Sequence, residues 1–381
     1  MTLTVYMDCH STTPVDPRVI ESMHPWWHDQ PGNSSSKTHE YGRKAQSELE
    51  ESRAKVASII GAHSDKITFT SGSTESSNTV LFGLLHQENN DHLIVTTTEH
   101  KAILDPSAVI AESGIAATLV PVDQHGQTDL EGIEKAISPS TKLISVIYAN
   151  NEVGSINPIK EIGAFCRERK ILFHTDATQA VGKIPLDVSN LPIDLMSFSA
   201  HKLYGPQGIG ALYVRNEEIR RQIRPLIYGG GHERGLRSGT VPVPLVAGFG
   251  KACELSQDLM QTDAQKIGAM RDRLWQRFQT EIPNVILNGH PTERLYNNLN
   301  VSFIGIPSEA FIIKLRDIVA VSAGSACTSA NPEPSHVLKA MNVGHARLES
   351  AIRFGLGRFN TMDEVEFVAD KVRDAVRELR G

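Results

Sequence analysis

The stretch from about residue 53 to 215 alternates short apolar runs with amphipathic segments, and this alternation constrains the fold most strongly. Two of the runs, Leu143 to Tyr148 and Ile171 to Thr175, are almost continuously apolar, which is typical of strands covered on both faces. Between them Pro158 is expected to open a helix with one apolar side. The pattern predicts an α/β layer fold with helices on both faces of a mainly parallel sheet. Further strands are predicted at Ile67 to Thr70, His92 to Thr97, Leu195 to Ser199 and Ile209 to Val214.

After Gly229-Gly230-Gly231 the composition changes, because Gly, Arg and Ser dominate up to Thr240 and the alternating pattern ends, which indicates a second structural unit. A helix is predicted from about Val243 to Arg277, and shorter strands and terminal helices follow it. The first dozen residues are extended and end in proline, so we expect them to pack away from the sheet that follows them. We therefore expect a large domain over residues 14–256 and a small α+β domain over residues 1–13 and 257–381.

Charge and cysteine content exclude several classes of protein. The 381 residues carry 38 Lys and Arg against 44 Asp and Glu, a net charge of −6, which argues against nucleic acid as a partner. No apolar run approaches the roughly 18 residues that a membrane helix needs, and the first residues do not have the pattern of a signal peptide. Four cysteines are too few for a disulfide scaffold, so we expect reduced thiols in a cytoplasmic protein.

Lys202 follows the predicted strand Leu195 to Ser199 and precedes a glycine-rich turn. Open α/β sheets bind their ligands at such strand ends. A lysine at this place is either a solvated surface residue or an amine that condenses with an aldehyde cofactor.

Asp176 ends another predicted strand, where a buried carboxylate needs a partner. It either caps the turn that follows or pairs with the pyridinium nitrogen of a cofactor. Gln179, three residues further on, is within reach of the hydroxyl group on such a ring. His100 also follows a predicted strand, and its neutral ring either stacks on an aromatic cofactor or caps a helix.

The segment Thr70 to Glu75 is a predicted strand-to-helix turn built from small residues. Its backbone N–H groups, together with the hydroxyls of Ser73 and Thr74, suit an anion, although a simple helix cap has the same composition. Combined with Asp176 and Lys202, the turn predicts a site that binds a phosphate group, pairs a carboxylate with a pyridine nitrogen and condenses an amine with an aldehyde. These are the three features that pyridoxal 5'-phosphate requires.

Cys327 lies among small, polar residues in a predicted loop, where a thiol is accessible to reactants. Cys166 and Cys253 lie on apolar helix faces and are expected in the core. Arg353, inside an apolar strand-like run, needs an anion. That anion is either a substrate carboxylate or a carboxylate of the protein itself.

These residues fall within longer motifs, at 70–76, 98–101, 150–154, 174–179, 197–202, 229–240 and 324–327. In this order the motifs resemble the cysteine desulfurases of the class V aminotransferase group, in the branch of the iron–sulfur-cluster and nitrogen-fixation enzymes. The resemblance covers essentially the whole chain. It implies a fold-type-I pyridoxal-phosphate transferase, with a large, mainly parallel seven-stranded sheet and a small domain that carries the Cys327 loop.

The same resemblance implies a role for each site residue. Lys202 would hold the cofactor as a Schiff base, Asp176 would meet the ring nitrogen and Gln179 the phenolic oxygen. His100 would stack on the ring and assist catalysis. The cofactor phosphate would be bound by Ser73, Thr74, Ser199 and His201, with Thr240 reaching the phosphate of the other subunit in a homodimer. Asn151 is implied near ring and substrate, and Arg353, with Asn33 nearby, at the substrate carboxylate.

The implied reaction converts L-cysteine to L-alanine and leaves the sulfur as a persulfide on Cys327. A sulfur acceptor or an iron–sulfur scaffold protein would then take the sulfur. No bound metal is implied, apart from Cys327 as a transient ligand of an iron–sulfur cluster.

Other functions stay open at this point. On the same fold, a selenocysteine lyase or a class V aminotransferase is an alternative, although an aminotransferase needs no cysteine in the loop. A sulfur-delivery platform that works only with its acceptor is another. Cys9 and His10 replace an aromatic–small pair that is usual in the family. Cys9 therefore either pairs with Cys327 or a metal, or is a tolerated substitution. The chain ends at Gly381, so we do not expect scaffold docking through a longer C-terminal extension.

Overall fold

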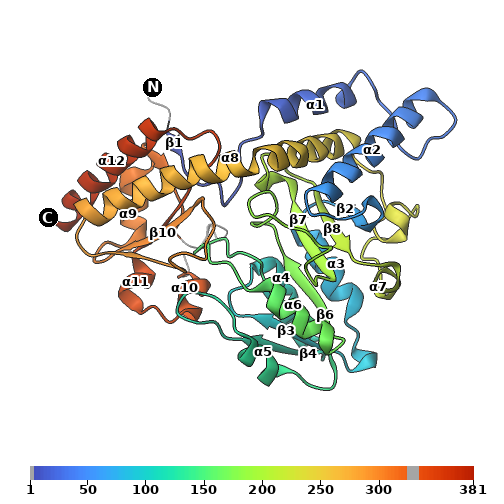
Figure 1. Cartoon of the computed structure of the whole chain (residues 1–381), viewed down its shortest axis with the longest axis horizontal. Coiled ribbons are helices and arrows are strands. Elements are labelled where there is room, and N and C mark those ends of the chain that lie inside the picture. The colour runs from blue at the N-terminus through green and yellow to red at the C-terminus, as the bar shows by residue number, and fades with distance from the viewer. Residues whose placement is uncertain (1–3, 324–333) are drawn as a thin grey trace.

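A seven-stranded sheet forms the centre of the larger part of the molecule, in the order β2-β8-β7-β6-β5-β3-β4 (Figure 1). The computed structural model describes residues 4–323 and 334–381. Neighbouring strands pair in parallel, except that β8 runs antiparallel to β7 and to β2. The predicted mainly parallel, seven-stranded sheet is therefore confirmed. Its strands are β2 (Ile67–Thr70), β3 (His92–Thr96), β4 (Ala116–Val120), β5 (Thr141–Ser145), β6 (Leu172–Asp176), β7 (Leu195–Ser199) and β8 (Gly210–Val214).

Helices cover both faces of this sheet, as the apolar runs predicted. Within β3, Leu93 and Val95 belong to one apolar core and Ile94 to another, because successive side chains of a strand point to opposite faces. On the Leu93 side the core is completed by α3 (Ser73–Leu84), α4 (Lys101–Glu112) and α7 (Glu217–Gln222). On the other side it is completed by α1 (Pro17–Trp27), α2 (Glu40–Ser58), α5 (Leu130–Ala136), α6 (Ile159–Glu168) and the first half of α8 (Val243–Glu281).

The remaining elements form a smaller part around an antiparallel sheet of order β12-β10-β9 and a parallel pair β1-β11. Val5 and Met7 from the N-terminal segment share its core with Ile352 and Phe354. Val5 and Met7 thus pack away from the large sheet, as predicted, whereas His10 and Ser11 accept hydrogen bonds from Lys202 at the end of β7. The exact domain boundaries stay predictions. The elements are β1 (Val5–Tyr6), β9 (Val285–Leu287), β10 (Asn298–Phe303), β11 (Val319–Ala320), β12 (Ala351–Gly355), α9 (Ser308–Leu315), α10 (His336–Ala340), α11 (His345–Glu349) and α12 (Met362–Arg380).

The 39-residue helix α8 joins the two parts (Figure 1). Its first half buries Val246 and Phe249 in the core of the large sheet, and its second half buries Leu274 and Phe278 in the core of the smaller part. The helix extends one turn beyond the predicted end. Short 3-10 turns complete the fold: η1 (Ser64–Lys66), η2 (Gln87–Asn89), η3 (Ala200–Lys202) and η4 (Glu233–Gly235).

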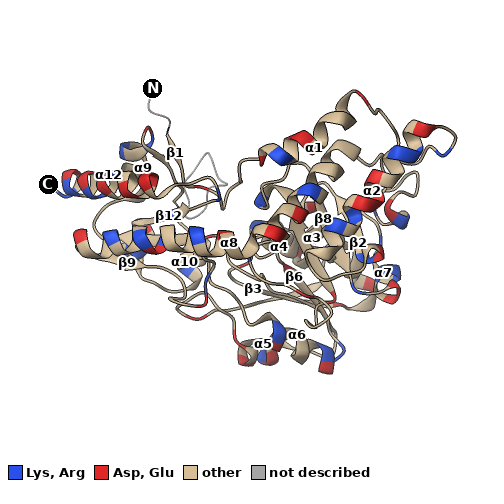
Figure 2. Cartoon of the chain, turned by 45° about the horizontal axis from the view of Figure 1, so that its top comes forward, with Lys and Arg blue, Asp and Glu red and all other residues tan. Residues whose placement is uncertain are grey.

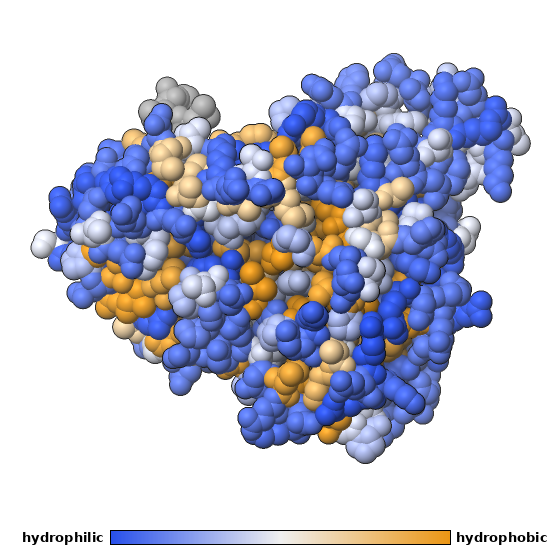
Figure 3. Space-filling view, viewed as in Figure 1, coloured by the Kyte–Doolittle hydropathy of each residue, from blue (hydrophilic) through white to orange (hydrophobic). Residues whose placement is uncertain are grey.

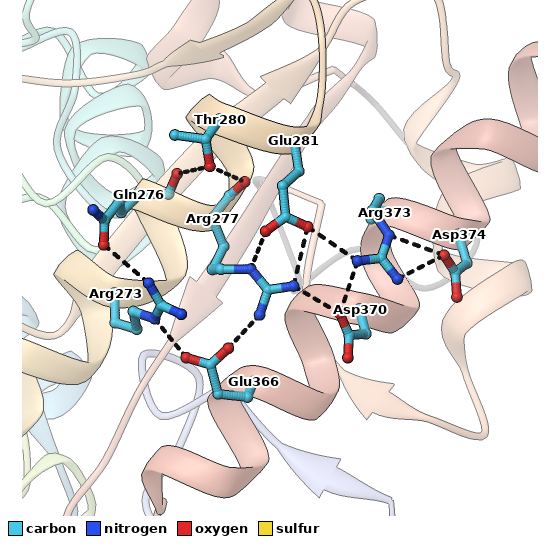
Figure 4. A network of polar contacts seen from close by, with 9 residues as sticks. All are labelled: Arg273, Gln276, Arg277, Thr280, Glu281, Glu366, Asp370, Arg373 and Asp374. Carbon is cyan, nitrogen blue, oxygen red and sulfur yellow. Dashed lines mark hydrogen bonds and ion pairs between the residues drawn. The ribbon is translucent and has the colours of Figure 1, made fainter.

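The helix α12 runs beside the second half of α8, and charged residues of both signs follow its length (Figure 2). A network of ion pairs joins the two helices, and Arg277 lies at its centre (Figure 4). Arg277 donates to Glu281 on its own helix and to Glu366 and Asp370 on α12. Across the two described ranges, none of the helices has the length and apolar character needed to cross a lipid bilayer.

Candidate active site

A cavity of about 420 Å³ opens at one edge of the large sheet. Four of the predicted residues reach it from four neighbouring parallel strands. His100 follows β3, Asn151 follows β5, Asp176 ends β6 and Lys202 follows β7. Parallel strands end at the same edge, so residues that are far apart in sequence meet there. The cavity also gathers the predicted Ser73, Thr74, Gln179, His201 and Arg353.

Among the described residues, three of the predicted ones do not line this cavity: Asn33, Ser199 and Thr240. Asn33 is exposed, and its side-chain oxygen accepts from the backbone N–H of Ser35. Thr240 is also exposed and does not line the cavity of its own chain. Cys327 lies outside the described residues. The roles assigned to all of the predicted site residues, inside the cavity or outside it, stay predictions.

Lys202 lies in the turn η3 and is held by the N-terminal segment. Its Nζ donates to the backbone carbonyls of His10 and Ser11. The side chain therefore lies in the cavity rather than extended into solvent. The segment that holds it comes from the far end of the chain, which no local pattern indicated.

Asp176 forms the turn cap that was one of its two alternatives. The residue is buried, and its Oδ1 accepts from the backbone N–H of Thr178 at 2.9 Å, which caps the turn. It also lines the cavity, where its negative charge counters part of the effect that burial has on the pKa of His100.

His100 likewise forms the helix cap that was one of its two alternatives. Its Nδ1 accepts from the backbone N–H of Ala102 at 3.1 Å and caps α4, while the ring lines the cavity. Burial lowers the pKa of His100, and the nearby positive charge of Lys202 lowers it further. The ring is therefore held in its neutral form, as a stacking role requires.

Small residues shape the region where the phosphate is expected. The backbone of β8 passes so close to the turn before α3 that a Cβ on Gly210 would lie 2.7 Å from Cα of Gly72. Ser199 lies beside this turn and is buried, and its hydroxyl has no hydrogen-bond partner among the described residues. Burial lowers the pKa of His201 to about 4, so its ring is neutral, with Nδ1 3.1 Å from the hydroxyl of Thr12.

Arg353 on β12 forms the internal ion pair that was one of its two alternatives. One of its terminal nitrogens, Nη2, donates to Asp8 at 2.9 Å and to the hydroxyl of Ser11 at 2.8 Å. The other, Nη1, donates to the backbone carbonyl of Asn151 at 2.9 Å. Its Nε is buried and unpartnered within the described ranges. The guanidinium lines the cavity, where it is positioned to meet an anion.

Gln179 and His10 hold each other in the cavity wall. The Gln179 side-chain NH₂ donates to the His10 carbonyl at 3.0 Å, so its oxygen accepts from His10 Nδ1 at 3.1 Å. Burial lowers the pKa of His10 well below its usual value, and the ring is neutral. His10 was singled out in the sequence only as a departure from the family pattern.

Several other residues at the site were not expected. Asp8, Glu152 and His336 line the cavity, and although Glu152 falls within the motif at 150–154, no role was assigned to any of the three. Lys183 is buried beside Lys202, and its Nζ donates to the Lys202 carbonyl at 3.2 Å. No sequence pattern around Lys183 predicted this contact.

The cysteines that the structure describes are all buried. Cys166 and Cys253 lie in the core, as predicted. Cys9 is packed beside Gly357, and burial raises its pKa to about 12, so it is a neutral thiol. Within residues 4–323 and 334–381 no group of three or more His, Cys, Asp and Glu side chains is arranged to hold a metal ion.

Comparisons with known proteins match this arrangement. Residues 5–368 match the aminotransferase class-V family. A cysteine desulfurase of Mus musculus is 47% identical over 378 residues, which cover 99% of this chain and 82% of the relative. Cysteine desulfurase IscS of Rickettsia typhi is 44% identical over 382 residues, which cover 100% of this chain and 93% of the relative.

Solved structures agree with these sequence relatives. One described as a NifS-like protein has a TM-score of 0.91 and 35% identity, and the match covers 99% of this chain and 100% of that one. Another, described as SspA in complex with cysteine, has a TM-score of 0.84 and 34% identity, covering 94% of this chain and 100% of that one. The chain therefore belongs to the aminotransferase class-V family, within its group of cysteine desulfurases.

Proposed function

We propose that the protein takes the sulfur of L-cysteine, leaves L-alanine and holds the sulfur as a persulfide on Cys327. The observation that carries this proposal is the cavity in which Lys202, Asp176 and Arg353 meet. A primary amine, a carboxylate and a guanidinium together suit an amino acid bound next to a pyridine cofactor. The solved relative in complex with cysteine supports L-cysteine as the substrate.

The described residues fit pyridoxal phosphate. The unpartnered, buried hydroxyls of Ser199 and Thr178 are donors that phosphate and ring oxygens would satisfy. Ser73 and Thr74 begin α3, whose first turn has no side-chain cap, so its backbone N–H groups suit an anion. We propose that these residues and His201 hold the phosphate, that Asp176 holds the ring nitrogen, and that Lys202 holds the cofactor through Nζ.

Each residue then has a defined task. When bound, the cofactor would supply an aldehyde for the amino group of the substrate and an electron sink for the pair left at Cα. Arg353 binds the substrate carboxylate, and Lys202, held at the carbonyls of His10 and Ser11, removes the proton from Cα. The Cys327 thiolate attacks the substrate sulfur. An S–S bond forms on Cys327, the C–S bond breaks, and the carbon skeleton takes up protons and leaves as alanine.

Partners and location are part of the same proposal. We infer a homodimer in which the exposed Thr240 serves the cavity of the other subunit, and an acceptor, such as an iron–sulfur scaffold protein, that takes the persulfide sulfur. A persulfide on Cys327 needs a reduced thiol, which fits the cytoplasm.

Replacing Cys327 tests the proposed function. We expect Cys327→Ala to bind pyridoxal phosphate normally, since it is not one of the residues that we propose to hold the cofactor, but to lose at least 100-fold in alanine release from L-cysteine. Persulfide is measured by mass spectrometry of the chain after incubation with L-cysteine. The matched control is Cys166→Ala, which removes a thiol buried in α6.

The control is expected to keep alanine release and the persulfide. Normal turnover by Cys327→Ala would contradict the role of Cys327. Alanine release by the wild type only when an acceptor protein is present would instead favour the sulfur-delivery platform.

A further inference from the structure

The turn before α3, where the cofactor phosphate is proposed to bind, carries an acidic side chain that the proposed function does not explain. A second cavity of about 440 Å³ adjoins the first and shares Ser73, Thr74 and His201 with it. Among the described residues that line this second cavity, Glu75 is the one charged side chain, because the His201 ring is neutral. A phosphate monoester carries about two negative charges near neutral pH. An uncompensated carboxylate in the same cavity would therefore oppose its binding.

The other groups at this turn attract an anion only through partial charges. The 12-residue helix α3 begins here without a side-chain cap, so its first backbone N–H groups and its dipole are directed to the turn. Ser199 is buried beside the turn, and its hydroxyl has no hydrogen-bond partner among the described residues. No lysine or arginine that the structure describes lines this second cavity. The balance of full charges at the turn is therefore set by what neutralises Glu75.

Arg237, in the segment between η4 and α8, is the partner of Glu75. Its Nε donates to Oε1 of Glu75 at 2.9 Å, and its Nη2 donates to Oε2 at 3.5 Å. The backbone N–H of Ser71 also donates to Oε2, at 2.8 Å, so the carboxylate is held against the turn. Burial would raise the pKa of Glu75, but the hydrogen bonds from Arg237 and Ser71 outweigh it and hold this pKa below its usual value. The Glu75 carboxylate is therefore ionised, and one guanidinium balances it.

The pair is shielded from water and salt. The side chains of Glu75 and Arg237 are 12% and 22% exposed, so their interaction is screened less than that of a surface pair. Arg237 has no second ion-pair partner within residues 4–323 and 334–381. It is also not among the described residues that line either cavity. Its effect on a bound phosphate would therefore act through Glu75, and its removal would leave a partly buried carboxylate unpaired.

We propose that Arg237 is a positioning residue that neutralises Glu75 and thereby lets the turn before α3 bind the phosphate of pyridoxal 5'-phosphate. The Glu75 carboxylate fixes the turn through the hydrogen bond from Ser71, and Arg237 removes the electrostatic cost of that carboxylate to the phosphate. The proposal deepens the proposed function and rests on it, because the phosphate is that of the cofactor.

Substitutions at the two positions test the proposal, because their expected effects differ in sign. Pyridoxal 5'-phosphate and pyridoxal are titrated into the full chain freed of cofactor, and binding is measured from the absorbance of the ring bound at Lys202. Arg237→Met is expected to weaken the binding of pyridoxal 5'-phosphate about 10-fold, and to change that of pyridoxal, which has no phosphate, by less than about twofold. Glu75→Gln is expected to bind pyridoxal 5'-phosphate at least as tightly as the wild type, since it removes the negative charge.

Two further variants separate charge from structure. The double variant Arg237→Met, Glu75→Gln carries neither charge and is expected to recover the wild-type affinity for pyridoxal 5'-phosphate to within about threefold. If Arg237 acted only by holding the segment that carries Thr240, the double variant would not recover. Arg237→Lys keeps the positive charge and is expected to lose less affinity than Arg237→Met.

Arg215→Met is the matched control. Arg215 also pairs with a buried carboxylate, that of Asp194 at 2.8 Å. Asp194 precedes β7 and therefore lies at the end of this strand opposite to Lys202. We expect Arg215→Met to leave the affinity for both ligands unchanged, even where it lowers the stability of the fold.

The outcomes are distinct. No loss in Arg237→Met, an equal loss in Glu75→Gln, no recovery in the double variant, or an equal loss with pyridoxal would overturn the role of Arg237 while leaving the proposed function intact. A wild-type chain that binds neither ligand would overturn the proposed function and this proposal with it.

Discussion

At the scale of single residues, burial decides which groups around the cavity are charged. Lys183 is buried against Lys202, and burial, with the charge of Lys202, lowers the pKa of its amine to about 7. Glu99 is completely buried, and burial raises the pKa of its carboxyl to about 8, so it is neutral at pH 7. Its Oε1 accepts from Thr96 and from the backbone N–H of Ile147, while its Oε2 has no partner among the described residues.

The raised pKa of Glu99 predicts a pH-dependent cost in stability. Below about pH 4.5 both the folded and unfolded states hold the proton, whereas between about 4.5 and 8 only the folded state holds it. Rising pH therefore favours the unfolded wild type. Glu99→Gln cannot ionise, so its stability relative to the wild type should rise across this window, by up to about 1.4 kcal/mol per pH unit.

Urea unfolding of both proteins at several pH values between 5 and about 8 checks this prediction. Gln keeps the acceptor for Thr96 and Ile147, which makes the comparison nearly isosteric. A difference in stability that does not change with pH would show that Glu99 is ionised in the folded protein.

At the scale of secondary-structure elements, α8 and α12 are joined by buried apolar packing and by a network of ion pairs nearer the surface. Val365, Val368 and Val372 of α12 are buried in the same core as Leu274 and Phe278 of α8. Outside this seam, Arg277 and Arg373 each meet carboxylates from both helices (Figure 4). Exposed pairs of this kind contribute little singly, and a network contributes more.

We predict that Arg277→Met destabilises the protein by about 1 kcal/mol, because one guanidinium serves three carboxylates and its side chain is only 12% exposed. The loss should shrink in 1 M salt, where a Debye length of about 3 Å screens the pairs. Urea unfolding at low and high salt measures it. Arg316→Met, at a side chain that is 70% exposed and paired with the adjacent Asp317, is the control and should change stability little. A loss that is independent of salt would point to packing by the Arg277 stem instead.

At the scale of the whole molecule, the surface offers apolar side chains for association. Figure 3 shows apolar side chains toward the centre of one face and hydrophilic ones around its edge. Tyr228 is 76% exposed, and a hydrogen bond from Ser238 to the carbonyl of Gly229 closes the segment that joins it to Thr240. An exposed aromatic residue on the segment that carries Thr240 supports the homodimer that we propose.

We predict that Tyr228→Ser weakens the homodimer at least 10-fold and, with it, the retention of pyridoxal phosphate, because Thr240 would no longer reach the other subunit. Sedimentation velocity compares the measured mass with that of the 41.8 kDa chain, and absorbance reports the bound cofactor. Ile313→Ser on α9, at a residue that is 64% exposed, is the matched control. A monomeric wild type that retains its cofactor would contradict this prediction.

Local patterns in the sequence were sufficient to predict six of the seven strands of the large sheet. Strands buried on both faces give continuous apolar runs, so β5, β6 and β7 were recognisable from composition alone. The edge strand β4 was not predicted, since its half-exposed residues form no such run. The short strands β1 and β9 are too brief to give a pattern.

The residues at the strand ends were predictable for the same reason. Lys202, Asp176 and His100 directly follow recognisable strands, and parallel strands bring their ends together. Their motifs also identified the family, which the comparisons confirm.

Only the tertiary structure decided what surrounds these residues. Asp8 and Arg353 are 345 positions apart and form an ion pair because β12 and the N-terminal segment share the smaller part of the fold. His336 reaches Glu99 across 237 positions. The sequence by itself determined the sheet, the order of the motifs and the family, because local periodicity and motif chemistry encode them. Partners and protonation states were decided by contacts between distant segments and by burial, which no local pattern contains.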